Sequence, residues 1–259
     1  MNVRNSVMLC AVFAAGGLCG ERSYPAGTLY FFANDYSGPP VVDAPFCGEQ
    51  HSARTVTQSD GAQRTEEVGL EKICRDSAGR TRYEYPIHLG GRQVGPLFVE
   101  IYDPVAHAKY IFYAVNKTVY RQELPARRAQ HPPVGAAVPA GSDLVGEVEN
   151  LGAQTMEGLL VEGRRFARQV PAGQERNKTS FTRTFEDWWA PELGESLLDK
   201  SSDPVKGELV HKLIDITRAE PDPDLFRLPP DYAVVNETRD FTILWGSDRG
   251  AEPVETSGH

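Results

Sequence analysis

The heptapeptide LFVEIYD, residues 97–103, carries the alternation of side chains that decides the fold. Its odd-numbered positions are aliphatic up to Asp103, whereas its even-numbered positions are aromatic or acidic. Successive side chains of a strand point to opposite faces of a sheet, so this pattern predicts a strand. Pro104 ends the pattern, and residues 109–115 follow with apolar side chains on both faces. We therefore expect two neighbouring antiparallel strands here.

Turn residues divide the chain on either side of this pair into further strands. The expected strands are 52–59, 63–75, 80–87 and 118–124 in a first set, and 144–151, 159–170, 179–189, 195–200 and 208–218 in a second. Residues 222–226 are expected to form one helical turn, with Leu225 and Phe226 in the core. The sequence therefore predicts a mainly β fold: a strongly curved antiparallel sheet with few short helices.

The first twenty residues differ in kind from the rest of the chain. Arg4 precedes an apolar run at 7–18, which is typical of a secretory signal peptide and too short to span a bilayer. We expect a periplasmic or secreted protein with no stable membrane span after cleavage. Lipid attachment at Cys19 is an alternative, although Leu18 stands where such sites have a small residue.

Composition also sets the expected domain boundaries. A signal peptide at 1–20 and an irregular lead-in at 21–44 precede one domain at 45–235, which a Pro/Ala-rich linker interrupts at 125–141. Residues 236–259 are expected to form a partly disordered tail. The net charge of −9 disfavours nucleic acid as a partner, because a polyanion would be repelled.

Cys47 and Cys74 form an even pair once the signal peptide is removed, and an exported protein can hold them as a disulfide. They flank Asp60-Gly61, a dipeptide typical of a two-residue hairpin turn. Pairing Ser59 with Ala62 places Cys47 opposite Cys74, but at a hydrogen-bonded pair, whose spacing suits a disulfide less well. A β-bulge between the turn and the cysteines would change which residue pairs are hydrogen-bonded. Two buried thiols remain the alternative.

No familiar catalytic or metal-binding motif occurs in the chain, including G-x-S-x-G, the P-loop, G-x-G-x-x-G and H-E-x-x-H. The histidines are dispersed, and His211 is expected to be an ordinary strand residue. Asp222 and Asp224 could hold a cation, but the proline between them favours a capped turn. We therefore expect no enzyme, no cofactor and no metal.

The second half of the chain resembles a group of exported, uncharacterised bacterial proteins, and the resemblance covers about residues 45–235. The residues that carry it are Leu151-Gly152, Thr155–Gly158, Gly163–Arg165, Pro171–Gly173, Trp188, Ala190–Leu193, Gly207-Glu208, Ile216, Arg218, Glu220–Phe226, Pro229, Asp231 and Tyr232, with Arg75–Ser77 and Gly79–Thr81 in the first half.

More distantly, the ending of strand, acidic-proline turn, Leu-Phe, Pro and Tyr looks like periplasmic lipoprotein-carrier and stress-sensor domains of the LolA-like and RseB-like kind. The resemblance implies a half-open barrel whose concave face forms an apolar pocket for an acyl chain. Two departures from the carrier pattern are the lack of obvious lid helices and the proline-rich linker within the sheet.

Three functions follow as hypotheses. The first is a non-enzymatic envelope binding protein that holds or senses a lipid or lipoprotein acyl chain, and its expected apolar wall is Val99, Ile101, Phe112, Phe185, Trp188 and Leu213. The second is an envelope protein-interaction or structural module that uses exposed strand edges or tryptophans. The third is a hydrolase whose residues converge from distant strands.

Overall fold

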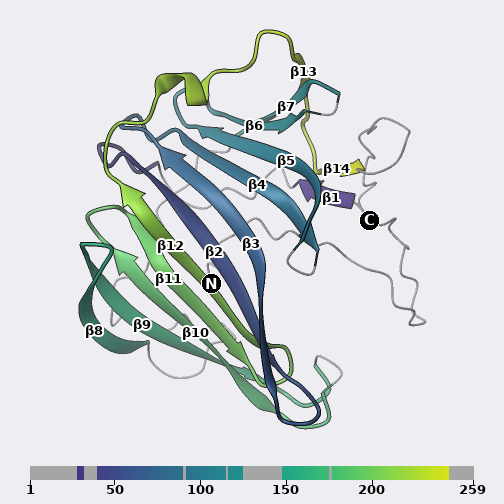
Figure 1. Ribbon diagram of the computed structural model, residues 1–259, viewed down its shortest axis with the longest axis vertical. Helices are drawn as coiled ribbons and strands as arrows, with labels where there is room; N and C mark the ends of the chain where they lie inside the picture. Colours follow the sequence, from purple (N-terminus) through teal and green to yellow (C-terminus); the bar gives the residue numbers. More distant parts are fainter. Residues whose placement is uncertain are drawn as a thin grey trace.

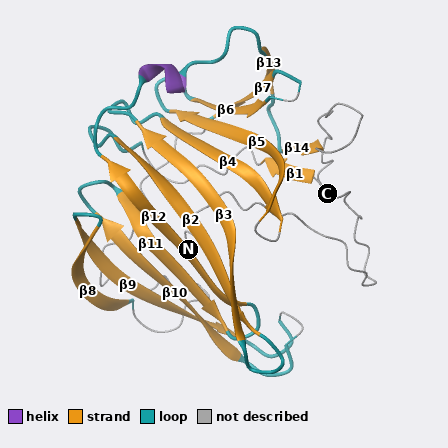
Figure 2. Ribbon diagram, viewed as in Figure 1, coloured by secondary structure: helices purple, strands orange, loops and turns teal. Residues whose placement is uncertain are grey.

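A twelve-stranded, open sheet dominates the computed structural model, which describes residues 28–31, 40–89, 92–114, 116–124, 148–174 and 177–244 (Figures 1 and 2). The strands are β1 (Thr28–Phe31), β2 (Phe46–Thr57), β3 (Gln63–Arg75), β4 (Thr81–Leu89), β5 (Arg92–Asp103), β6 (Ala108–Tyr113), β7 (Thr118–Glu123), β8 (Glu149–Met156), β9 (Leu159–Val170), β10 (Phe181–Ala190), β11 (Glu195–Asp203), β12 (Gly207–Thr217), β13 (Ala233–Asn236) and β14 (Phe241–Leu244).

Two antiparallel meanders build this sheet. Strands β2 to β7 form one and β8 to β12 form the other, and β12 pairs with β2 to join them. The strand order is β13-β7-β6-β5-β4-β3-β2-β12-β11-β10-β9-β8, in which only β13 runs parallel to its neighbour. The strands β1 and β14 form a separate two-stranded sheet (Figure 1). The two sets of predicted strands thus lie in one sheet.

The hairpin of β2 and β3 has a three-residue loop in place of the predicted two-residue turn. Gln58 donates its backbone N–H to Ala62, and Gly61 at the end of the loop has φ 84°. This loop moves the pattern of hydrogen-bonded pairs by one residue. Farther along, a bulge beside Ser52 restores the expected partners, so Cys47 lies opposite Cys74 with Cα atoms 4.1 Å apart. That is the short spacing of a non-hydrogen-bonded pair, and the two cysteines form a disulfide.

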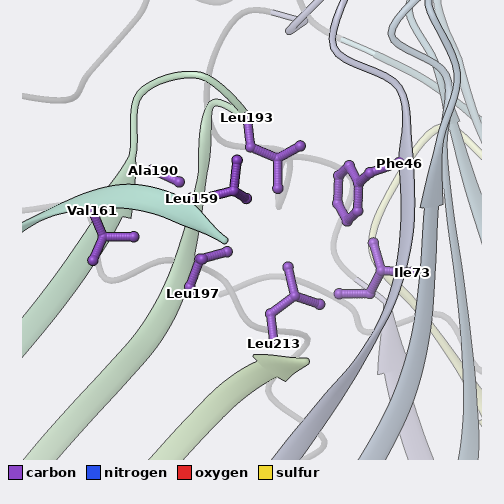
Figure 3. Packing of buried hydrophobic residues seen from close by; sticks show 8 residues of the cluster. All are labelled: Phe46, Ile73, Leu159, Val161, Ala190, Leu193, Leu197 and Leu213. Atoms are coloured by element: carbon purple, nitrogen blue, oxygen red, sulfur yellow. The ribbon is translucent and has the colours of Figure 1, made fainter. Parts of the chain in front are cut away.

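The core of the described residues consists of three apolar clusters. The largest gathers residues from both meanders, and Figure 3 shows Leu159 of β9 close to residues of β11, β12 and β2. Its members are Phe46, Ile73, Leu159, Val161, Ala190, Leu193, Leu197 and Leu213. A second cluster lies on the other face of β3 and β5 to β7, where Phe226 of the 3-10 turn η1 (Pro223–Phe226) packs against it. The third is described with the site below.

The mainly β, antiparallel class is confirmed, and η1 is the helical turn expected at 222–226. The strong curvature into a half-open barrel is not observed. The sheet is not closed, because its outermost described strands, β8 and β13, do not pair with each other. It is not strongly curled either.

Two segments that are expected to be irregular or partly disordered contain strands. Within the lead-in, Thr28–Phe31 is a strand, and the first part of the expected tail contains β14. The two strands form because they pair with each other, a contact between chain ends that no local pattern shows. The signal peptide, the linker at 125–141 and residues 245–259 lie outside the described part of the chain.

Candidate ligand-binding site

An aromatic floor covers one face of strands β4 to β7. We use this term for Tyr85, Phe98, Ile111, Tyr113 and Tyr120, all of which are buried. Tyr85 stacks on Phe98 with ring centroids 6.1 Å apart, and Phe98 stacks on Tyr113 at 5.5 Å. Cross-strand pairing explains the stacks, because Phe98 lies directly opposite both tyrosines in the sheet register.

The floor is covered by strand β14, whose Phe241 and Ile243 pack into it. The ring centroids of Phe241 and Tyr120 are 4.9 Å apart. Among the described strands, β14 pairs only with β1, and Phe241 and Ile243 of this two-stranded flap pack against the floor. Figure 1 shows the flap beside β5 as a small element apart from the large sheet. Phe241 and Ile243 are 2% and 0% exposed, so the flap closes this face of the floor.

A buried ion pair lies beside the floor. The Lys109 Nζ is 3.2 Å from a carboxylate oxygen of Glu100, and both residues are 1% exposed. The Tyr102 hydroxyl donates to Glu100 over 3.2 Å, and the Tyr85 hydroxyl donates to its other oxygen. The Lys109 ammonium also lies 5.3 Å from the ring centre of Tyr102. The carboxylate is thus neutralised and hydrogen-bonded, which a buried charge requires.

Glu71 of β3 has an unusual acidity. Burial and, secondly, the negative charge of Glu100 raise the pKa of the half-buried Glu71 from 4.5 to about 7. Both effects disfavour the charged form, so this carboxyl group titrates near neutral pH. Neither Glu71 nor Glu100 stood out in the sequence, because only the sheet brings β3 and β5 together.

Gln122 of β7 lies next to Lys109 in the sheet register and is 1% exposed. Its Nε2 donates to the backbone oxygen of Arg239 over 3.0 Å. Among the residues that the structure describes, none donates a hydrogen bond to its Oε1. A buried acceptor without a donor is uncommon in folded proteins and therefore marks this position.

A second set of polar side chains lies across strands β9 to β12 and β2. The Asp187 carboxylate accepts hydrogen bonds from Arg164, over 2.8 Å, and from Ser196. Farther along the sheet, the His211 Nδ1 lies 2.6 Å from the Ser52 Oγ. This contact fits the prediction that His211 is an ordinary strand residue.

The Ser52–His211 pair bears on the hydrolase hypothesis, since a serine next to a histidine is how a nucleophile meets its base. Asp199 lies opposite His211, which completes a familiar combination. Ser52, however, is only 5% exposed and Asp199 is equally buried. The Ser52 hydroxyl is therefore out of reach of a substrate in this structure, and we assign the pair a structural role.

The six residues of the expected apolar wall lie in different places. Val99, Ile101 and Phe112 belong to the cluster beneath η1, where Phe226 is buried with them. The others are near the second meander: Leu213 is in the cluster of Figure 3, Trp188 packs against that cluster, and Phe185 contacts Phe166. The structure therefore does not gather the six on one wall, and their contact with a ligand stays a prediction.

Asp222 and Asp224 form the capped turn that the sequence predicts. The Asp222 carboxylate accepts the backbone N–H of Asp224 over 2.9 Å at the start of η1. The described residues include no group of three or more His, Cys, Asp or Glu that could hold a metal ion. Within the same residues, no helix has the length and hydropathy needed to cross a bilayer.

Comparison with solved structures finds distant similarities. MucB from the MucA/MucB complex of Pseudomonas aeruginosa is 14% identical, with a TM-score of 0.41 over 74% of this chain and 58% of that one. A LolA superfamily protein from Nitrosomonas europaea is 10% identical, with a TM-score of 0.30 over 75% of this chain and 94% of that one. An uncharacterised conserved protein from Thermus thermophilus is 10% identical, with a TM-score of 0.38 over 73% of this chain and 90% of that one.

The expected similarity to LolA-like and RseB-like domains is thus confirmed as a distant structural one. No protein-family model matches the sequence. No curated protein sequence matches it either.

Proposed function

We propose that this chain is an exported, non-enzymatic binding protein of the cell envelope that holds or senses a lipid or lipoprotein acyl chain. The observation that carries the proposal is the aromatic floor beneath a two-stranded flap that is not part of the large sheet. An acyl chain would take the place of the Phe241 and Ile243 side chains on the floor. Burying its methylene groups there would offset the loss of those contacts.

Two further features support an extracytoplasmic site of action. The Cys47–Cys74 disulfide is typical of oxidising compartments. The apolar run at 7–18 after Arg4 is typical of an export signal. We place the protein in the periplasm or among secreted proteins on these grounds.

Displacement of a fluorescent fatty acid from the purified protein tests the proposal, with native mass spectrometry to detect bound lipid. We expect binding by the wild type and about tenfold tighter binding by Phe241→Ala, because this variant removes a side chain that the ligand must displace. Phe226→Ala is the matched control, since it removes the same side chain from the cluster on the other face.

Two outcomes contradict the proposal. A wild-type protein that carries no lipid and binds neither the fatty acid nor an uncharged acyl probe such as 1-monopalmitoylglycerol rules out acyl-chain binding. Equal effects of Phe241→Ala and Phe226→Ala would place any binding away from the aromatic floor.

A protein-interaction module is the second candidate, and the sheet edges favour it. All four residues of β13 at one edge are exposed, with Val234 at 49% and Val235 at 38%. An exposed edge strand can pair with an extended segment of another protein. The test is whether one stoichiometric envelope partner co-purifies with the wild type and is lost when Val234 and Val235 are both replaced by lysine. Retention of that partner by the variant contradicts this candidate.

A further inference from the structure

The buried carboxamide of Gln122 indicates what the polar end of the ligand carries. Tyr120 and Gln122 are two residues apart on β7 and therefore point to the same face of the sheet. Tyr120 is part of the aromatic floor, so Gln122 lies at one end of that floor. An acyl chain lying along the floor would bring its polar end within reach of this side chain.

The orientation of the Gln122 amide is fixed by its neighbours. The nitrogen must face the Arg239 carbonyl oxygen 3.0 Å away, because two oxygens would not hydrogen-bond. Within the described part of the chain, the carboxamide oxygen is therefore the atom without a donor. What it lacks is a hydrogen-bond donor, such as a hydroxyl or an amide N–H.

The neighbouring charges disfavour an ionic group at this position. Lys109 and Glu100 form a buried ion pair, so their charges balance. An added carboxylate would be a second buried anion facing an acceptor oxygen, and an added ammonium would lie near the Lys109 Nζ. Either charge would be desolvated beside an ion pair whose own charges already balance. A neutral donor meets neither obstacle.

We infer that the ligand is an acyl compound with a neutral hydrogen-bond donor at its polar end, and that the Gln122 Oε1 accepts this hydrogen bond. The inference rests on the proposed function, which it narrows from acyl chains in general to acyl glycerols and acyl amides. Fatty-acid anions and simple esters without a donor are the classes that it excludes as preferred ligands.

Competition binding with probes of one chain length tests the inference. The probes are 1-monopalmitoylglycerol, which donates through hydroxyls, palmitamide, which donates through its amide, and methyl palmitate, which has no donor. For the wild type we expect each donor probe to bind about tenfold more tightly than methyl palmitate, the usual effect of one buried hydrogen bond. A preference for only one of the two donor probes would tell a hydroxyl ligand from an amide ligand.

In Gln122→Leu we expect the preference to shrink to less than about twofold, with methyl palmitate affinity unchanged. Phe226→Ala is the control, because it alters the core on the opposite face. Equal wild-type affinities for all three probes overturn the inference but leave acyl-chain binding intact. This result needs only the wild type, so it holds even if Gln122→Leu fails to fold. A preference that persists in a folded Gln122→Leu protein also overturns it. Binding of no probe by the wild type overturns the proposed function itself.

Discussion

At the scale of single residues, Glu71 links stability to pH. Its pKa is about 7 in the folded protein and 4.5 as the ordinary value, so the folded state keeps a proton that the unfolded state releases between these pH values. Wild-type stability therefore falls as pH rises through that window, and the loss is complete above pH 7. We expect Glu71→Gln to be about 2 kcal/mol more stable than the wild type at pH 8 and equal to it at pH 4.

Urea denaturation at both pH values measures this effect. Glu123→Gln is the control, because Glu123 is an exposed carboxylate at the end of β7. A Glu71→Gln protein whose advantage is the same at pH 4 and pH 8 would show that the carboxyl group titrates normally.

A second residue-scale prediction concerns Gly163, which lies opposite Trp188 in the sheet. A Cβ atom at Gly163 would lie 2.6 Å from the Trp188 Cζ3, which is closer than atoms can approach. We expect Gly163→Ala to cost about 2 kcal/mol of unfolding free energy, because the indole must move. Gly69→Ala is the matched control: its Cβ would lie 3.3 Å from the Ser52 Cβ and should cost less than about 1 kcal/mol.

Denaturation midpoints of the two alanine variants make the comparison, and the variant Trp188→Leu completes a double-mutant cycle. Similar costs for Gly163→Ala with and without the tryptophan would mean that the indole does not lie over the glycine.

The sequence predicts the environment of single residues only where their neighbours in the chain determine it. The alternation in LFVEIYD correctly places Phe98 and Ile101 on opposite faces, in the clusters beneath β14 and η1. The same alternation gives no sign that Glu100 is buried with Lys109. The cover over this face comes from residues near 240, more than a hundred positions away, and no local pattern contains that information.

At the scale of elements, the disulfide clamps the open end of the β2–β3 hairpin. It joins residues 27 positions apart in the chain, a loop whose closure restricts the unfolded state. We expect the double variant Cys47→Ala, Cys74→Ala to lose about 3 kcal/mol of stability. Urea unfolding of the wild type with and without reductant should show the same loss.

Two outcomes contradict this prediction. Alkylation that labels two thiols in the unreduced, exported protein would show that the disulfide does not form. A double variant as stable as the wild type would show that the hairpin holds itself closed without the bond.

The sequence predicts a strand or turn well where residues close together in the chain determine it. Strands with alternating residues and a clear turn, such as 63–75 and 159–170, match the structure closely. The pairing of Cys47 with Cys74 is also confirmed, although the three-residue loop differs from the predicted turn. Strands β1 and β14 were missed because each is short and forms only through the other.

At the scale of the whole molecule, the two halves of the chain are interleaved. Strand β12 pairs with β2, β13 with β7 and β14 with β1, so three strands of the second half pair with strands of the first. We expect a chain cut at a protease site inserted within 125–141 to stay together as one particle. Size-exclusion chromatography should show the two fragments co-eluting in buffer and separating only in denaturant.

An uncut chain carrying the same insertion is the control for the site itself. Fragments that separate in native buffer, each still folded, would contradict the joint sheet and indicate two independent domains.

The sheet order is the part of the fold that the sequence could not supply. Consecutive strands pair as a meander predicts, but the junction of β12 with β2 connects segments about 160 residues apart. The choice of an open sheet over a half-open barrel depends on how these distant strands meet. Packing across the whole molecule determines this, and the alternation of side chains along the chain contains no information about it.

The late arrival of β12 has a consequence for biogenesis. A ribosome or an export channel delivers strands in chain order, so β2 emerges long before its outer partner exists. Until residues 207–217 follow, the nascent first half carries an unsatisfied row of backbone amides and carbonyls along β2. That row can pair with other chains until β12, in the last third of the polypeptide, covers it.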